Sequence, residues 1–346
     1  TAFHPNPNKT VRALSKLNNI LFVGGEFDSI GGIARKGIAS INANSGIVNN
    51  WNAKCDGTVN AILAKDSLLY VCGFFYYITD KRLPGFAILN INNFKIYSDY
   101  TFVGSINSIT ADTNAVFVAG NFNSYGKSIL NFAKVTTTNV TIDKNMALLQ
   151  RDYFFEDIYN SIFSAASDGI GGWYLCGNIS TKQGLKNLVH INANNTLDTV
   201  FNPNPDNTVY DLHIKGNTIY VAGNFTNVDG QSQPYLAAVN KTNGSLINSF
   251  TPQINSNVKC IEVVNNDLYL GGDFTTINTV QRSRLASINI GTGILSTWNP
   301  NVDKSVYCLT IKDSVIFVGG TFKFVGTQYR NFCASIYLSN GLPTPW

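Results

Sequence analysis

The chain has 346 residues, of which 44% are hydrophobic and only 13% charged, and its formal net charge is +4. This composition excludes a disordered chain, and the scattered Lys and Arg residues exclude a basic stripe for nucleic acid. No apolar run approaches the roughly 20 residues that a membrane-spanning helix needs. The chain opens on Thr1 without a signal-peptide pattern, so we expect a processed mature protein or part of a longer polypeptide.

One short phrase returns seven times along the chain. It consists of a β-forming apolar residue, an aromatic residue, Val or Leu, a small residue, Gly, any residue, and then Phe or Ile. Recurrence of this kind predicts many copies of one supersecondary unit. The copies begin at Leu21, Leu69, Val116, Trp173, Ile219, Leu268 and Ile316.

Each unit is predicted to hold four strands in chain order. The first strand has the form Val-x-small-aliphatic, as in Val209 to Leu212 or, in the fourth unit, Tyr159 to Ile162. The second strand carries the recurring phrase, a polar turn leads to the third, and the fourth ends near an aromatic residue. Four short β-rich runs per unit are typical of a β-propeller blade. The units are predicted to begin near residues 11, 59, 106, 159, 209, 258 and 306.

The fold is therefore predicted to be all-β, a seven-bladed β-propeller of four-stranded antiparallel blades that forms one domain over residues 1–346. The opening segment, Phe3 to Thr10, matches the tail of a repeat at Phe201 to Thr208. We expect residues 1–10 to help close the ring, because closure removes exposed strand edges. The Gly of each phrase is expected where neighbouring blades approach closely or where the strand bends.

Three motifs connect the chain to a known repeat. They are the Φ-Tyr-Val-Gly-Gly-x-Phe phrase, the Ala-Ser-Ile-Asn strand at residues 39–42 and 286–289, and Thr-Gly-x-Leu-x-x-Trp-Asn-Pro at residues 292–300. On these motifs the chain resembles the delta-sixty-type propeller repeat, and it is similar to kelch-like repeats of fungal cell-surface polarity markers. The resemblance implies a propeller in a secreted or cell-surface setting, and it implies no catalytic residues.

The six cysteines show no Cys-x-x-Cys pair and no Cys/His cluster, so no metal is predicted. Cys72, Cys176, Cys260 and Cys308 occupy small-residue positions of the strands, where we expect them to fill the core. No Gly-rich phosphate loop opens a helix, and no Gly-x-Ser-x-Gly elbow occurs. We therefore predict no cofactor.

Three polar residues form the only weak catalytic candidate. Asp211 and His213 lie on the first strand of the fifth unit, and Glu262 holds the position of His213 in the sixth unit. First strands line the tunnel of a propeller, so these side chains could converge there. A His between carboxylates can act as a general base or a cation ligand. The alternative is a buried, hydrogen-bonded polar cluster.

Aromatic residues next to arginines suggest a binding surface. One set lies in the second unit, where Phe74, Tyr76 and Tyr77 precede Arg82. The other lies in the long connection between the third and fourth units. Exposed aromatics of this kind are predicted to contact a protein partner or the face of a sugar, and the alternative is local core. The second set comprises Arg151, Tyr153, Phe154 and Phe155.

We expect a non-enzymatic extracellular or cell-surface module for binding, adhesion or scaffolding. Its partner is expected to be a protein or a surface glycan, not nucleic acid, and direct membrane insertion is not expected. Two alternatives stay open. One is a carbohydrate-binding propeller lectin, and the other is a polysaccharide hydrolase or lyase that uses the tunnel mouth with Asp211, His213 and Glu262.

Overall fold

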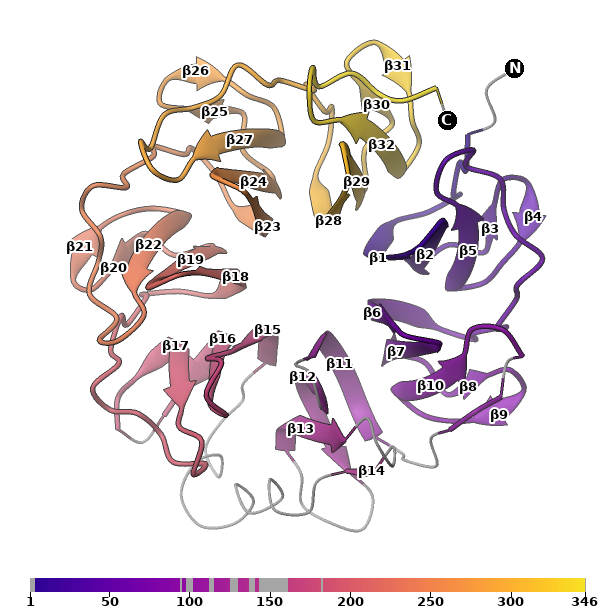
Figure 1. Ribbon diagram of the computed structural model, residues 1–346, viewed down its shortest axis with the longest axis horizontal. Coiled ribbons are helices and arrows are strands. Elements are labelled where there is room, and N and C mark those ends of the chain that lie inside the picture. The colour runs from indigo at the N-terminus through magenta and orange to yellow at the C-terminus, as the bar shows by residue number, and fades with distance from the viewer. Residues whose placement is uncertain are drawn as a thin grey trace.

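Within the residues that the computed structural model describes, seven antiparallel sheets of three or four strands follow one another, numbered here as sheets 1 to 7 in chain order. Figure 1 shows them arranged around an open centre, with the first strand of each sheet innermost. This is the arrangement of a β-propeller. The structure describes residues 4–93, 95–97, 102–111, 115–124, 130–136, 141–142, 161–181 and 183–345.

The strands of each sheet run outward from the centre in chain order. The innermost strands are β1 (Val11–Leu17), β6 (Thr58–Lys65), β11 (Phe102–Ala111), β15 (Ser161–Ser167), β18 (Val209–Lys215), β23 (Val258–Val264) and β28 (Val306–Lys312). The second strands are β2 (Ile20–Gly25), β7 (Leu68–Phe74), β12 (Ala115–Ser124), β16 (Trp173–Ser180), β19 (Thr218–Gly223), β24 (Asp267–Gly272) and β29 (Val315–Gly320). The third strands are β5 (Ile38–Asn42), β10 (Phe86–Asn90), β13 (Leu130–Thr136), β17 (Lys186–Ile191), β22 (Leu236–Asn240), β27 (Leu285–Asn289) and β32 (Cys333–Tyr337).

The fourth strand differs from the prediction. Sheet 3 has one, β14 (Thr141–Ile142), whereas the corresponding segment of each other sheet makes a single antiparallel bridge, as between Ile41 and Val48. The chain turns back at once after the third strand, because Asn42 Oδ1 accepts the N–H groups of Asn44 and Ser45. A tight Asx turn of this kind leaves few residues to pair.

Small two-stranded hairpins lie at the outside of five sheets (Figure 1). In each, an Asn or Asp oxygen from the preceding tail accepts two backbone N–H groups at the start of the hairpin, as Asp56 does from Tyr76 and Tyr77. The hairpins are β3 (Ser29–Ile30) with β4 (Ile33–Ala34), β8 (Tyr77–Ile78) with β9 (Lys81–Arg82), β20 (Asn227–Val228) with β21 (Gln231–Ser232), β25 (Thr276–Ile277) with β26 (Val280–Gln281), and β30 (Phe324–Val325) with β31 (Gln328–Tyr329).

The hydrophobic core lies between neighbouring sheets. The second strands are continuous apolar runs, and both of their faces are buried, as in a sheet that is covered on both sides. Phe22 of sheet 1 packs in one cluster with Leu69 and Val71 of sheet 2. The position before the recurring Gly is small for this reason: a Cβ added to Gly24 would lie 2.6 Å from Val59 Cγ1 of the next sheet.

The two ends of the ring meet between sheets 1 and 7. Val11 of β1 packs against Gly319 of β29. The described part of the opening segment contacts both sheets: Asn8 Oδ1 accepts the N–H of Asp28, and Asn331 Nδ2 donates to Pro7 O at 3.0 Å. The role of residues 1–10 in stabilising closure stays a prediction. Within the described ranges, no segment forms a helix long and apolar enough to span a membrane.

Candidate ligand site at the mouth of the channel

Each innermost strand contains a β-bulge at the same position. In sheet 1, Val11 pairs with Gly25 and Ala13 with Gly24, so Arg12 is skipped by the pairing. Bulges redirect a side chain away from the regular alternation of a strand. The corresponding bulge residues of sheets 2 to 7 are Asn60, Asn107, Phe163, Tyr210, Lys259 and Tyr307.

The recurring Gly is the structural requirement of this bulge. A Cβ on Gly25 would overlap the carbonyl oxygen of Thr10, which the bulge brings onto the second strand. The other six recurring glycines face the equivalent carbonyl of their own sheet. A bend in the strand and a close neighbouring sheet were the two predicted reasons for small residues, and each applies at a different position. Gly25 is required by the bend in its own sheet, and Gly24 by the side chains of the neighbouring sheet.

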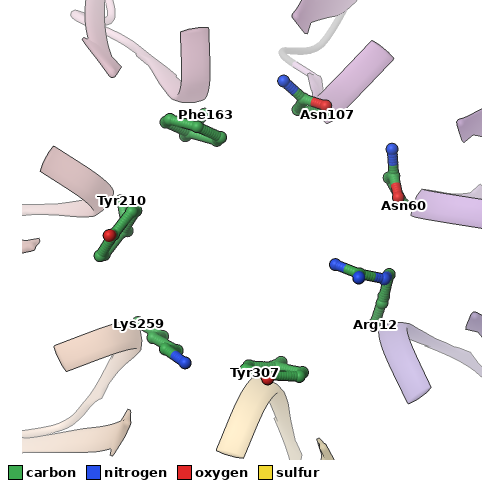
Figure 2. Close-up of a pocket in the computed structure, with 7 residues that line it drawn as sticks. All are labelled: Arg12, Asn60, Asn107, Phe163, Tyr210, Lys259 and Tyr307. Atoms are coloured by element: carbon green, nitrogen blue, oxygen red, sulfur yellow. The ribbon is translucent and has the colours of Figure 1, made fainter. Parts of the chain in front are cut away.

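The seven bulge residues surround one opening at the centre of the ring (Figure 2). They line a cavity of about 370 Å³, which is within the size range of small-molecule sites. We call this cavity the channel mouth. Val11, the residue before the bulge, pairs with Gly25, the last residue of β2, and the hairpin β3–β4 follows Gly25 in the chain. The mouth therefore opens at the same end of the sheets as the hairpins.

The two cations of the mouth are each paired with a carboxylate. Arg12 Nε donates to Glu26 Oε1 at 2.7 Å, and Lys259 Nζ lies 2.9 Å from Asp273 Oδ2. Burial opposes ionisation of Asp273, but hydrogen bonds from Ser305 and Lys259 outweigh it and lower its pKa. The lowered pKa keeps the Asp273 carboxylate ionised near neutral pH. In each pair the formal charges of the cation and the carboxylate cancel.

Aromatic rings occupy one side of the mouth. The rings of Phe163 and Tyr210 meet edge to face, with centroids 5.8 Å apart. Lys259 Nζ lies 4.3 Å from the centroid of the Tyr307 ring, a cation–π distance. Burial and the charge of Asp273 raise the pKa of Tyr210, so its phenol stays protonated and able to donate a hydrogen bond.

Amides occupy the opposite side and are held by a chain of hydrogen bonds. Asn60 Nδ2 donates to Ser105 Oγ at 3.0 Å, and Ser105 Oγ donates to Asn107 Oδ1 at 3.0 Å. This chain crosses from sheet 2 to sheet 3 and orients both amides before any ligand arrives. Preorganised polar groups of this kind cost less to order on binding.

None of the seven mouth residues was among the predicted site residues, although the sequence contains a signal for them. They occupy the x of the Val-x-small-aliphatic strand, the one position of that strand that changes in size, charge and aromaticity from copy to copy. In sheet 4 the first-strand motif lies three residues later than the predicted segment, Tyr159 to Ile162. Ile162 pairs with the recurring Gly177, so Phe163 is the bulge residue. Variation inside an otherwise repeated strand marks a position that packing does not dictate.

The predicted catalytic residues Asp211 and Glu262 bind backbone groups of the next sheet. Asp211 Oδ2 accepts the N–H of Ile261 at 2.9 Å, and Glu262 Oε2 accepts that of Ile311 at 3.0 Å. Burial raises the pKa of Asp211 to about 6. Burial, together with the charge of Asp211, raises that of Glu262 to about 7. These oxygens therefore tie neighbouring innermost strands together.

His213 is not joined to either acid by a hydrogen bond among the described residues. Burial and the charge of Lys215 lower its pKa, so its ring is neutral near pH 7. The catalytic role of Asp211, His213 and Glu262 stays a prediction.

A histidine between two carboxylates does occur, but it is His190 on β17. Its Nδ1 lies 2.9 Å from Asp198 Oδ2, its Nε2 lies 3.2 Å from Asp168 Oδ2, and its ring stacks on Tyr174 at 4.3 Å. Asp168 Oδ1 also accepts the N–H of Gly172, which holds the lengthened turn of sheet 4. Within the described part of the chain, no group of three or more His, Cys, Asp or Glu side chains could hold a metal ion.

The predicted aromatic surface is exposed where the structure describes it. The side chains of Phe74, Tyr76 and Tyr77 are about half exposed, and the Phe74 and Tyr76 rings lie 6.0 Å apart. Tyr77 pairs with Arg82 across the hairpin β8–β9. Arg151, Tyr153, Phe154 and Phe155 lie outside the described residues.

All six cysteines are described, and none forms a disulfide. Cys72, Cys176 and Cys260 are buried as predicted, and Cys308 is partly buried. Burial raises the pKa of Cys55 to about 12, which keeps this thiol protonated and unreactive.

Comparisons with known proteins identify the class of the chain. Residues 217–250 match the family model described as a domain of unknown function (DUF5122) beta-propeller. A comparison with curated protein sequences finds no match. The WD40 beta propeller domain of Doa1 superposes with a TM-score of 0.58 at 12% identity, over 92% of this chain and 91% of that chain.

Two further solved structures are similar over most of the chain. Sqt1 from Saccharomyces cerevisiae has a TM-score of 0.56 at 9% identity, with 99% of this chain and 86% of that chain covered. The extracellular domain of BT3049 from B. thetaiotaomicron has a TM-score of 0.55 at 11% identity, with 90% of this chain and 39% of that chain covered. Likeness at such identities concerns the fold alone. The chain is an all-β propeller of the repeat type, as predicted.

Proposed function

We propose that the protein is a non-enzymatic binding module, a seven-bladed propeller that holds a ligand at its channel mouth. Each of the seven sheets counts as one blade, and the fourth strand of most blades is reduced to one bridge. One observation carries the proposal: seven β-bulges direct seven side chains of different chemistry into one cavity of about 370 Å³. Sites of this kind combine apolar walls with a few oriented polar groups.

We further propose that the module works outside the cell or at its surface, where it binds a protein or a glycan. Support comes from the resemblance to delta-sixty-type and kelch-like repeats, and from BT3049, whose similar domain is extracellular. The exposed rings of Phe74, Tyr76 and Tyr77 suit a contact with a second macromolecule. Burial of five of the six thiols would protect them from oxidation in that setting.

The test is a ligand-observed NMR screen of the full chain against sugars, amino acids, nucleotides and organic acids. We expect at least one compound to bind and to remain chemically unchanged during incubation. Its binding should weaken in Asn107→Ala and Tyr210→Ala, which alter opposite sides of the mouth, and persist in Tyr329→Ala, which alters an exposed ring on the hairpin β30–β31.

Two results would count against this function. Conversion of a bound compound into product would make the protein an enzyme. If every compound that binds does so equally well to Asn107→Ala, Tyr210→Ala and the unaltered chain, the mouth is not the site.

A further inference from the structure

The charges of the channel mouth narrow the class of its ligand. Each cation already has a carboxylate partner, Arg12 with Glu26 and Lys259 with Asp273. An anionic ligand would have to compete with these carboxylates, and a cationic ligand would have to compete with the two cations. A site whose fixed charges cancel gives little electrostatic preference for a charged ligand. The mouth therefore favours a neutral one.

The aromatic side of the mouth offers flat apolar surfaces. Figure 2 shows the rings of Phe163, Tyr210 and Tyr307 bordering the open centre. Lys259 Nζ and the Arg12 guanidinium lie over the Tyr307 ring, 4.3 Å and 5.9 Å from its centroid. The rings offered to a ligand are therefore those of Phe163 and Tyr210. The face of an aromatic ring is the negative part of its quadrupole. It attracts the weakly positive C–H groups that cover one face of a pyranose ring.

The amide side offers hydrogen bonds to hydroxyl groups. Asn60 and Asn107 are held in place through Ser105. Asn60 Nδ2 also donates to Ile106 O, so Asn60 offers its Oδ1 as an acceptor, whereas Asn107 Nδ2 donates to Ile162 O and keeps a second N–H group. The paired Arg12 and Lys259 keep further N–H groups, because a guanidinium carries five donors and an ammonium three. Neutral hydroxyls can use such donors without separating the ion pairs.

We propose that the channel mouth binds a neutral saccharide, a mono- or disaccharide or the end of a glycan chain. The sugar ring lies between the aromatic side and the amide side, with its C–H face toward Phe163 and Tyr210 and its hydroxyls toward Asn60 and Asn107. This inference rests on the proposed function and names the chemical class of its ligand. The cavity of about 370 Å³ suits a ligand of this size.

The test is isothermal titration of the full chain with neutral probes and charged comparators. The neutral probes are glucose, galactose, mannose, N-acetylglucosamine, lactose, maltose and cellobiose. The comparators are galacturonate, glucosamine and inorganic phosphate. We expect at least one neutral sugar to bind more tightly than all three comparators, and its Kd to rise about tenfold in Tyr210→Ala and in Phe163→Ala.

Three matched variants locate the binding. Tyr329→Ala removes an exposed aromatic ring on the hairpin β30–β31, outside the mouth, and should leave the Kd unchanged. Trp51→Phe alters a separate hollow of about 470 Å³ lined by Trp51, Asn49 and Asn92, and should also leave it unchanged. Asp273→Asn frees the charge of Lys259, so it should admit phosphate or galacturonate while the neutral sugar still binds.

The possible outcomes distinguish a failure of the saccharide inference from a failure of the proposed function. If a charged comparator or a non-sugar binds the unaltered mouth and the neutral sugars do not, the saccharide inference is overturned and the proposed function stands. Sugar binding that is lost in Trp51→Phe or Tyr329→Ala, and kept in Tyr210→Ala and Phe163→Ala, would place the site elsewhere and overturn both. Circular dichroism and thermal unfolding of each variant show whether a lost signal reflects unfolding.

Discussion

The bulge positions of the innermost strands, such as Tyr210, differ from the positions deeper along the same strands, such as Asp211 and Glu262. The bulge residues are partly exposed, vary from sheet to sheet and surround one opening. The deeper residues face neighbouring sheets, and their polar atoms are used by backbone groups. A single skipped pair in each sheet thus separates side chains that hold the ring together from side chains that are available to a ligand.

The largest expected effect comes from replacing one of the recurring glycines on which the bulge depends. In Gly272→Ala, the added methyl would overlap the carbonyl of Asn257 and lie 2.9 Å from Val258 Cα. Backbone atoms cannot yield as a side chain can, so we expect the free energy of unfolding to fall by about 4 kcal/mol. Lys259 should also leave the mouth. Urea unfolding measures the first effect.

Gly230→Ala is the matched control for this glycine. Gly230 has a φ of +69° but nothing within 4 Å of an added Cβ, so only backbone strain remains, about 1 kcal/mol. Equal costs for the two variants would mean that the bulge does not depend on the missing side chain of Gly272.

A smaller effect is expected from the buried acid Glu262, and it depends on pH. Its pKa in the folded chain is raised to about 7 from an ordinary value near 4.5. Between these values the folded state holds more protons than the unfolded state, so this group contributes stability below about pH 4.5 that is lost as pH rises through 7. In Glu262→Gln we expect about 2 kcal/mol less loss of stability from pH 4.5 to 8.

Denaturant unfolding at several pH values measures this difference. Gln can still accept the N–H of Ile311, so the variant retains the hydrogen bond and changes only the charge. Identical pH profiles for the two proteins would show that Glu262 is not desolvated. His213, whose pKa is lowered, contributes with the opposite sign but equally in both proteins.

The smallest expected effect belongs to a mouth residue. Phe163 is half-buried and touches Tyr210 edge to face, so Phe163→Ala should cost about 1 kcal/mol or less. The matched core variant, Phe274→Ala, removes a fully buried ring and should cost about 3 to 5 kcal/mol. Thermal unfolding compares the two. Equal losses of stability in the two variants would show that Phe163 is a packing residue, and the contrast between mouth residues and core residues would not hold.

Several site predictions could not be settled along the chain alone. His213 was predicted to converge with Asp211 and Glu262, and its catalytic role stays a prediction. The structure places a different histidine, His190, between two carboxylates, Asp168 and Asp198. Asp168 reaches His190 through a lengthened turn, and Asp198 reaches it because the chain turns back beside β17, where Ile191 bridges Leu197. Asp211 and His213 lie two residues apart and therefore on the same face of β18. Asp211 Oδ2 nevertheless accepts the N–H of Ile261 from the next sheet, and no hydrogen bond joins it to His213 within the described residues.

The sequence by itself determined the class of the fold and the roles of its recurring residues. A strand that must pack against copies of itself on both sides needs the same apolar, small and Gly positions in every unit, so packing leaves a periodic record in the chain. The mouth leaves none, because its residues vary and lie in seven separate repeats. Only the closure of the ring brings Arg12 and Tyr307, from the first and last sheets, to the same opening as Phe163. Ring geometry, rather than any local preference, decides which side chains meet there.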